Sequence, residues 1–112
     1  MQSYGMTLML KDGEGIIDRY KEYHRKAWPE VVSRLRENGI REMRIYLLGR
    51  RMFMYMEAVD GFSPERDFPK LVQDPRYREW DELMRTLQER APEGKPEDWW
   101  APMEEVFDLS SQ

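Results

Sequence analysis

The sequence predicts an α+β fold whose elements follow one another as β-α-β-β-α-β, the ferredoxin-like order. Segments in which apolar residues alternate with others, typical of half-buried strands, lie near the start and in the middle of the chain, and a further strand is expected near its end. Stretches with the apolar spacing of amphipathic helices separate them. At 112 residues, the length suits one domain, residues 1–112, and is too short for two.

The first half of the chain gives a strand followed by an interrupted helix. Residues 4–10 (YGMTLML) alternate as a strand does. Apolar side chains then recur at helical spacing from Ile16 to Ala27, and Pro29 is expected to break or restart this helix. The pair Asn38-Gly39 is a typical helix stop signal.

Two strands follow, at residues 43–48 and 52–59, and the intervening Gly49-Arg50 indicates a hairpin. The pairs Ser63-Pro64 and Asp74-Pro75 each indicate a helix start, the first of a short helix and the second of a longer one.

The end of the chain is expected to complete the sheet. Residues 91–98 (APEGKPED) form the one clear Pro/Gly-rich loop, and residues 102–109 are predicted as the final strand.

One face of such a sheet is covered by helices, and the other face needs a different cover. Here that second face carries several large apolar side chains, more than a water-exposed face normally presents. A second copy of the chain, packed sheet to sheet, buries them. The sequence therefore predicts a homodimer.

Composition excludes several classes of function. The hydrophobic fraction is 40%, the charged fraction is 36%, and the net charge of −4 is interspersed, which argues against nucleic-acid binding. No apolar run reaches the roughly 18 residues of a membrane span. The absence of cysteine excludes thiol chemistry and fits a cytoplasmic protein. A single histidine excludes a multi-histidine metal site built within one chain.

Tyr20 and His24 are the first candidates for chemistry. Four residues apart on a helix, they share one face, one turn from each other. Histidine takes and gives protons near neutral pH, and tyrosine donates a hydrogen bond. The alternative is a histidine that satisfies a hydrogen bond in the core beside a tyrosine, and spacing alone leaves both interpretations open.

Tryptophans offer surfaces on which the apolar patches of sugars pack. Trp80 belongs to the inner face of the second long helix, and Trp99-Trp100 precede the expected last strand. Packing in the core or between two copies is the alternative for each of them. Because adjacent strand residues point to opposite faces, Trp99 and Trp100 cannot both point inward.

The stretch YKEYHRKAWPE at residues 20–30 contains Tyr-x3-His-x3-Trp-Pro-Glu and resembles the L-rhamnose mutarotase family. The resemblance covers most of the chain in order. Further matching positions are Leu35, Gly39-Ile40, Ile45 to Leu47, Phe53 to Glu57, Trp80, Met84 and Glu105 to Phe107.

This resemblance implies a dimeric α+β barrel and an enzyme that needs neither metal nor cofactor. It implies interconversion of the α and β anomers of a 6-deoxy sugar such as L-rhamnose, with His24 and Tyr20 in the sugar site. Rhamnose-specific members of the family carry a tandem Trp-Trp on the second long helix. Here Trp80 matches the first and Asp81 takes the second place, which puts the identity of the sugar in question more than the reaction.

Anomer exchange requires opening of the sugar ring. A base takes the proton of the O1 hydroxyl while an acid gives one to the ring oxygen, and rotation and reclosure follow. His24 is expected to pass the proton, with Tyr20 as orienter or second donor and Tyr46 as a hydroxyl partner. Asp81 suits a sugar that presents an additional hydroxyl at this position, and Trp99 or Trp100 is a candidate for the missing indole platform.

Two other classes of function stay open at this point. Small dimeric α+β barrels also host haem- or quinol-handling monooxygenases, an argument from fold analogy alone. A non-catalytic module that binds a small ligand in an aromatic-lined cavity is the other.

Overall fold

A computed structural model describes all residues from 1 to 112. The strands are β1 (Gln2–Leu10), β2 (Ile40–Leu48), β3 (Arg51–Ala58), β4 (Gln88–Glu89) and β5 (Ala101–Pro102). The helices are α1 (Ile16–Arg25), α2 (Pro29–Glu37), α3 (Pro64–Leu71) and α4 (Pro75–Arg85), and a 3-10 turn spans Leu109–Ser111. The predicted β-α-β-β-α-β order is confirmed through β4, with two helices in each helical segment.

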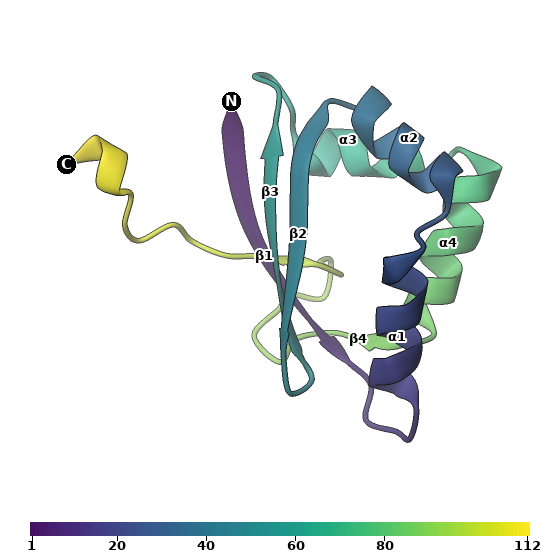
Figure 1. Cartoon of the computed structure of the whole chain (residues 1–112). Helices are drawn as coiled ribbons and strands as arrows, with labels where there is room; N and C mark the ends of the chain where they lie inside the picture. Colours follow the sequence, from purple (N-terminus) through teal and green to yellow (C-terminus); the bar gives the residue numbers. More distant parts are fainter.

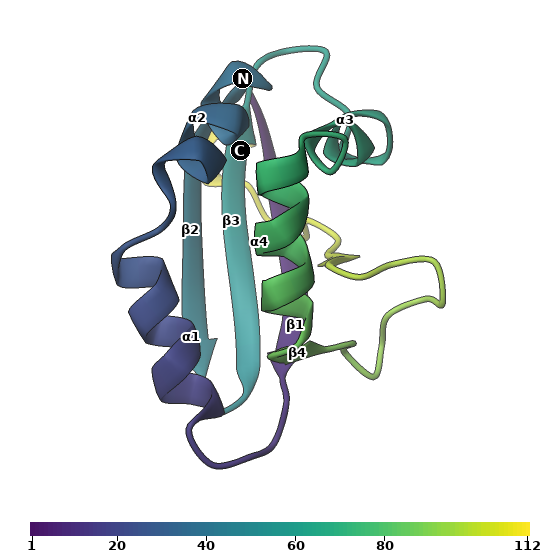
Figure 2. The same cartoon turned by 90° about the vertical axis from the view of Figure 1, so that its right-hand side faces the viewer.

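The strands form one antiparallel sheet in the order β2-β3-β1-β4, and β5 also pairs with β1. All four helices lie on the same side of this sheet (Figure 1). Turned by 90°, the view shows α1 and α2 in one row and α4 beside them (Figure 2). The opposite face of the sheet therefore has no helix over it.

Prolines set the helix starts that the sequence predicts. Pro29, Pro64 and Pro75 each occupy the first turn, where a missing N–H costs no hydrogen bond. The side chain of Asp74 accepts a hydrogen bond of 2.9 Å from the backbone N–H of Tyr77 and so caps α4. These starts fix which face α4 turns toward the sheet.

The core lies between the helices and the sheet. Alternation along β1 and β3 points every second side chain at the helices. The resulting buried cluster consists of Leu8, Leu10, Tyr20, Val31, Met52, Trp80, Met84 and Leu87. Tyr20 and Trp80 are thus core residues as well as site candidates.

The predicted final strand at residues 102–109 is wrong. Only Ala101–Pro102 are strand, and the edge beside β1 is shared between β4 and β5. The last backbone hydrogen bond between this segment and β1 runs from the amide of Met103 to the carbonyl of Gly5, at 2.8 Å. Apolar residues in a segment favour its burial, but a strand also needs a neighbouring strand to pair with. The remaining tail leaves the sheet on the side away from the helices (Figure 1).

Apolar side chains are exposed both on the open face of the sheet and along this tail. On the face, Tyr46 stacks on Phe53 with ring centroids 6.2 Å apart, and Leu48 is 85% exposed. On the tail, Val106 and Phe107 are also exposed. No helix of the protein combines the length and the apolar character that crossing a bilayer requires.

Candidate active site

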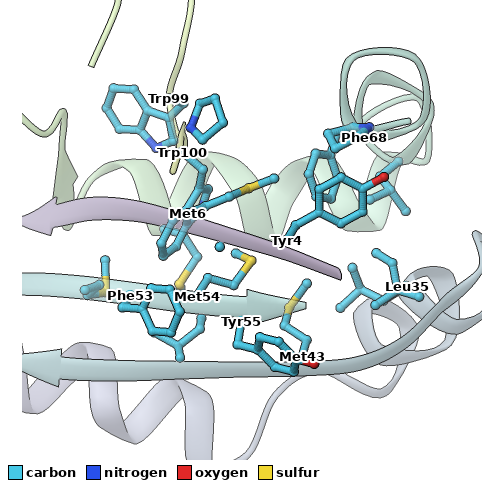
Figure 3. Close-up of a pocket in the computed structure, with 18 of the residues that line it drawn as sticks. Tyr4, Met6, Leu35, Met43, Phe53, Met54, Tyr55, Phe68, Trp99 and Trp100 are labelled. Carbon is cyan, nitrogen blue, oxygen red and sulfur yellow. The ribbon is translucent and has the colours of Figure 1, made fainter. Parts of the chain in front are cut away.

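A large hollow of about 1770 Å³ runs between the helices and the sheet. It exceeds the roughly 300–1,000 Å³ of most ligand pockets because its lining continues from the helix side to residues of the open face, including Phe53 and Tyr55. In Figure 3, Tyr4 and Phe68 lie toward one end of the lining and Trp99 and Trp100 toward the other. Volume alone does not locate a site here, so polar side chains must define it.

An aromatic cluster at the α1–α4 contact contains the predicted pair. The rings of Tyr20 and His24 lie 4.2 Å apart, one turn from each other on α1. The Trp80 ring approaches His24 edge to face at 5.4 Å, and Trp28 packs against Trp80 at 5.2 Å. The imidazole is therefore held between a phenol and an indole.

Helix geometry selects the tautomer of His24. Its Nδ1 lies 2.8 Å from the backbone carbonyl oxygen of Tyr20, one turn earlier. Since a carbonyl only accepts, Nδ1 must carry the hydrogen and donate, and Nε2 keeps a free lone pair. Burial, the largest effect, lowers the pKa of His24 below its usual 6.5, although the bond to the carbonyl opposes this. At neutral pH the ring is an uncharged base.

Tyr20 has the opposite character. Burial raises the pKa of its hydroxyl to about 12, so the group stays protonated at neutral pH. Its oxygen accepts a hydrogen bond of 3.1 Å from Nε2 of Gln88, and Oε1 of Gln88 accepts one of 2.8 Å from the Trp99 indole. A proton acceptor and a protonated hydroxyl thus lie together in the lining of one hollow.

The inner face of α4 adds Tyr77 and Asp81. Burial raises the pKa of Tyr77 strongly, and the negative charge of Asp81 adds to this. Nε of Arg85 donates to Oδ2 of Asp81 at 2.9 Å, which holds this half-buried carboxylate at the lining of the hollow beside Trp80. The lining of the hollow therefore includes an acceptor and a second hydroxyl in addition to His24 and Tyr20.

Sequence reasoning missed Tyr77 and Gln88. Tyr77 precedes Trp80 by three residues and Asp81 by four, so helical spacing places it on their face and was an available signal. Gln88 had no such signal, because its position depends on the pairing of β4 with β1.

The two C-terminal tryptophans occupy different places. Trp99 bonds to Gln88, and its ring lies under the guanidinium groups of Arg85 and Arg90, at 4.7 and 5.6 Å. Trp100 packs against both core clusters of the protein. Of the two, Trp99 is therefore tied to the Tyr20 hydroxyl.

Tyr46 does not join this site, which corrects the expectation that it is a hydroxyl partner of His24. Ile45 and Leu47 pack against the core, so the intervening Tyr46 points to the open face, where it is 54% exposed. The sheet separates it from the helix side, and it is absent from the lining of the hollow.

The fold defines the structural class, the α+β barrel type, with an uncharged imidazole and a protonated hydroxyl in the lining of the hollow. Within this class, a sequence profile of the L-rhamnose mutarotase family matches residues 3–109. The chain belongs to the L-rhamnose mutarotase family, a family of isomerases that exchange sugar anomers. This match does not favour the monooxygenase alternative.

Among the relatives of this chain are proteins named as mutarotases of two different sugars, L-fucose and L-rhamnose. The chain is 42% identical over 112 residues to a UPF0734 protein of Dictyostelium discoideum, covering 96% of this chain and 90% of that protein. It is 33% identical to an L-fucose mutarotase of Xanthomonas campestris pv. campestris, covering 98% and 90%. An L-rhamnose mutarotase of Paraburkholderia phymatum is 33% identical over 84 residues, covering 73% and 74%.

Solved structures share the fold. The crystal structure of L-rhamnose mutarotase from Formosa agariphila superimposes with a TM-score of 0.71 at 22% identity, covering 97% of this chain and 99% of that one. Tetracenomycin F2 cyclase from Streptomyces glaucescens gives 0.58 at 17% identity, covering 96% of each chain. Both likenesses confirm the α+β fold.

Proposed function

We propose that the protein interconverts the α and β anomers of a 6-deoxy sugar, with His24 as the base and Tyr20 as the hydrogen donor. The observation that carries this proposal is the bond from Nδ1 of His24 to the Tyr20 carbonyl. It leaves Nε2 as an acceptor in the hollow that the hydroxyl of Tyr20 also lines. A ring-opening reaction needs one group of each kind.

The proposed reaction moves protons only between the sugar, His24 and Tyr20. His24 takes the proton of the O1 hydroxyl as the C1–O5 bond breaks, and Tyr20 gives a proton to the ring oxygen. Rotation about C1–C2 turns the aldehyde, and the reverse transfers close the ring as the other anomer. Acid/base assistance of about 10²–10⁴-fold, plus positioning, is enough for a reaction that already proceeds slowly in water.

The sugar class follows from the lining of the hollow. The Trp80 indole offers a surface to the apolar side of a pyranose, and a buried 6-methyl group contributes about 0.8 kcal/mol. Asp81, held by Arg85, offers an acceptor where a second indole would offer only a stacking surface. The relative named as an L-fucose mutarotase covers nearly the whole chain. We therefore propose a preference for a sugar other than strict L-rhamnose, with L-fucose as the leading candidate.

Saturation-transfer NMR tests the activity without any coupled assay. One anomeric proton resonance of L-fucose, L-rhamnose or L-arabinose is saturated, and the loss of intensity of the other anomer is measured. We expect catalysed exchange with the 6-deoxy sugars, fastest with L-fucose. Exchange no faster than in buffer for every sugar would contradict the proposed function.

The protein is further proposed to act as a homodimer. One chain exposes apolar side chains on the open face and on its tail, including Leu48, Phe53 and Phe107. Because each copy carries both surfaces, two copies related by a twofold axis can cover one another. In such a dimer, the tail beyond Met103 packs on a strand or on the sheet face of the second copy.

A further inference from the structure

We propose that Gln88 is a positioning residue that presents the hydroxyl hydrogen of Tyr20 to the sugar, and that Trp99 fixes the orientation of its amide. This inference rests on the proposed function, since it concerns the donor in the same reaction. It gives a function to the buried polar side chain of Gln88, which neither the fold nor the proposed roles of His24 and Tyr20 otherwise explain.

The side chain of Gln88 has little freedom. Only 4% of the residue is exposed, and it lies on β4, opposite Leu10 of β1. A buried amide that loses its partners pays a large desolvation cost, so both of its ends must stay bonded. Those partners are Tyr20 on α1 and Trp99 on the segment after the Pro/Gly-rich loop.

Donor and acceptor chemistry orients the amide in one way only. The indole N–H of Trp99 donates and never accepts, so the atom that faces it at 2.8 Å must be the oxygen of Gln88. The amide nitrogen therefore faces Tyr20, at 3.1 Å from the phenolic oxygen. Flipping the amide would place an N–H against the indole N–H, break that bond, and turn the amide oxygen toward the Tyr20 hydroxyl.

This orientation decides what the Tyr20 hydroxyl can do. Its oxygen already accepts from Gln88, so its own hydrogen is not used within the pair and is free to donate into the hollow. An acceptor in place of the amide N–H would capture that hydrogen. Gln88 thus keeps Tyr20 available as a donor while His24 remains the acceptor.

Trp99 is itself held in place. The guanidinium groups of Arg85 and Arg90 lie over its ring, and such cation–π contacts favour one ring position. The chain of donors therefore runs from Trp99 through Gln88 to Tyr20. In this arrangement Trp99 acts through its N–H rather than as the indole platform that the sequence suggested.

Gln88→Glu tests the orientation because it replaces the donor with an acceptor of the same shape. The introduced carboxylate accepts from Trp99 and from Tyr20, so the hydroxyl no longer faces the sugar. We expect kcat to fall about 10²-fold at neutral pH, the lower range for one general acid, with little change in KM. As pH falls and the carboxyl takes a proton, it donates to Tyr20 again, and activity relative to wild type rises.

Gln88→Met and Glu89→Gln complete the comparison. The methionine keeps the volume but leaves the Tyr20 hydroxyl without an orienting donor, and about a tenfold loss of kcat is expected, the scale of one hydrogen bond, with no rise at low pH. Glu89 lies on the same strand and pairs with Arg50, so Glu89→Gln should behave as wild type. A Gln88→Glu variant with wild-type kcat and pH profile would overturn the proposal.

A second readout needs no activity. In protein with ¹³C-labelled tyrosine, the Cζ resonance of Tyr20, identified with Tyr20→Phe, reports whether its oxygen donates or accepts. It should move toward the position of an ionised phenol in Gln88→Glu and not in Gln88→Met. An unchanged resonance in Gln88→Glu contradicts the orientation even if wild type exchanges no sugar, whereas a shifted one supports it independently of the proposed function.

Discussion

The roles proposed for Tyr20 and His24 depend largely on local geometry. A helical turn brings the backbone carbonyl of Tyr20 to Nδ1 of His24, so the bond that selects the tautomer comes from within α1. Burial then acts oppositely on the two groups. It disfavours the charged form of each, which lowers the pKa of the imidazole and raises that of the phenol. One environment yields a neutral base beside a protonated donor.

The pH profile follows from these two shifts. His24 must be neutral to accept a proton, and its folded-state pKa lies below 6.5. We therefore expect kcat/KM to stay level around neutral pH and to fall only as pH drops below 6.5, through the lowered pKa. The pKa of Tyr20, about 12, puts the alkaline loss far above neutrality. Exchange rates across this range check the prediction, and an acidic limb centred above 6.5 would contradict it.

Asp81 is expected to set sugar preference. Asp81→Trp replaces an acceptor held by Arg85 with an indole surface. We expect the ratio of kcat/KM for L-rhamnose to kcat/KM for L-fucose to rise about tenfold, which is the scale of one contact in a pocket. Glu82→Trp adds the same bulk at the next, exposed position of α4 and should leave the ratio unchanged. A wild-type enzyme selective for L-rhamnose, with no shift in Asp81→Trp, would leave Asp81 without a role in specificity.

At the scale of elements, α2 turns tightly into β2. Gly39 makes this turn with φ of +95°, and a Cβ there would lie 2.7 Å from Cγ2 of Val59. Residues other than glycine rarely adopt such backbone angles, and at Gly39 the space that a Cβ would need is also occupied by Val59.

Gly39→Ala should therefore lower the free energy of unfolding by about 2 kcal/mol or more. Gly49→Ala is the matched control, because Gly49 also has a positive φ but nothing within 4 Å of its added Cβ. Its cost should be limited to backbone strain of about 1–2 kcal/mol. Chemical denaturation of both variants measures the difference, and equal losses would show that the contact with Val59 contributes nothing.

The sequence predicts elements well where a signal is local. Pro29, Ser63-Pro64 and Asp74-Pro75 mark helix starts that the structure confirms, because proline constrains its own backbone angle. A strand was predicted at residues 102–109, after the Pro/Gly-rich loop, yet a strand needs a neighbour to pair with, and only Ala101–Pro102 pair with β1 as strand β5. Tyr46 was expected to be a hydroxyl partner of His24, although its alternation with Ile45 and Leu47 puts it on the other face of the sheet. Gln88 depended on long-range pairing and could not be predicted.

For the whole molecule, the central feature is an uncovered sheet face beside an extended apolar tail. Both surfaces belong to one chain, and covering them by a second copy removes side chains such as Leu48 from water. In the proposed dimer, the ten residues after Pro102 are expected to contribute to that cover.

We expect the protein to sediment as a dimer at micromolar concentration. Removal of residues 103–112, or Leu48→Glu on the open face, should shift it toward monomer, since each removes or charges an apolar surface. Ser111→Ala, at the exposed end of the tail, should remain dimeric. A strictly monomeric wild-type protein in sedimentation would rule out the dimer.

Saturation transfer between the L-fucose anomers tests most directly whether His24 performs sugar anomer exchange. Wild type and His24→Ala are compared at equal concentration, with circular dichroism to show that both are folded. We expect strong transfer with wild type and a loss of about 10²-fold or more in His24→Ala. A folded His24→Ala variant that exchanges the anomers as fast as wild type would show that His24 is structural and that the proposed mechanism is wrong.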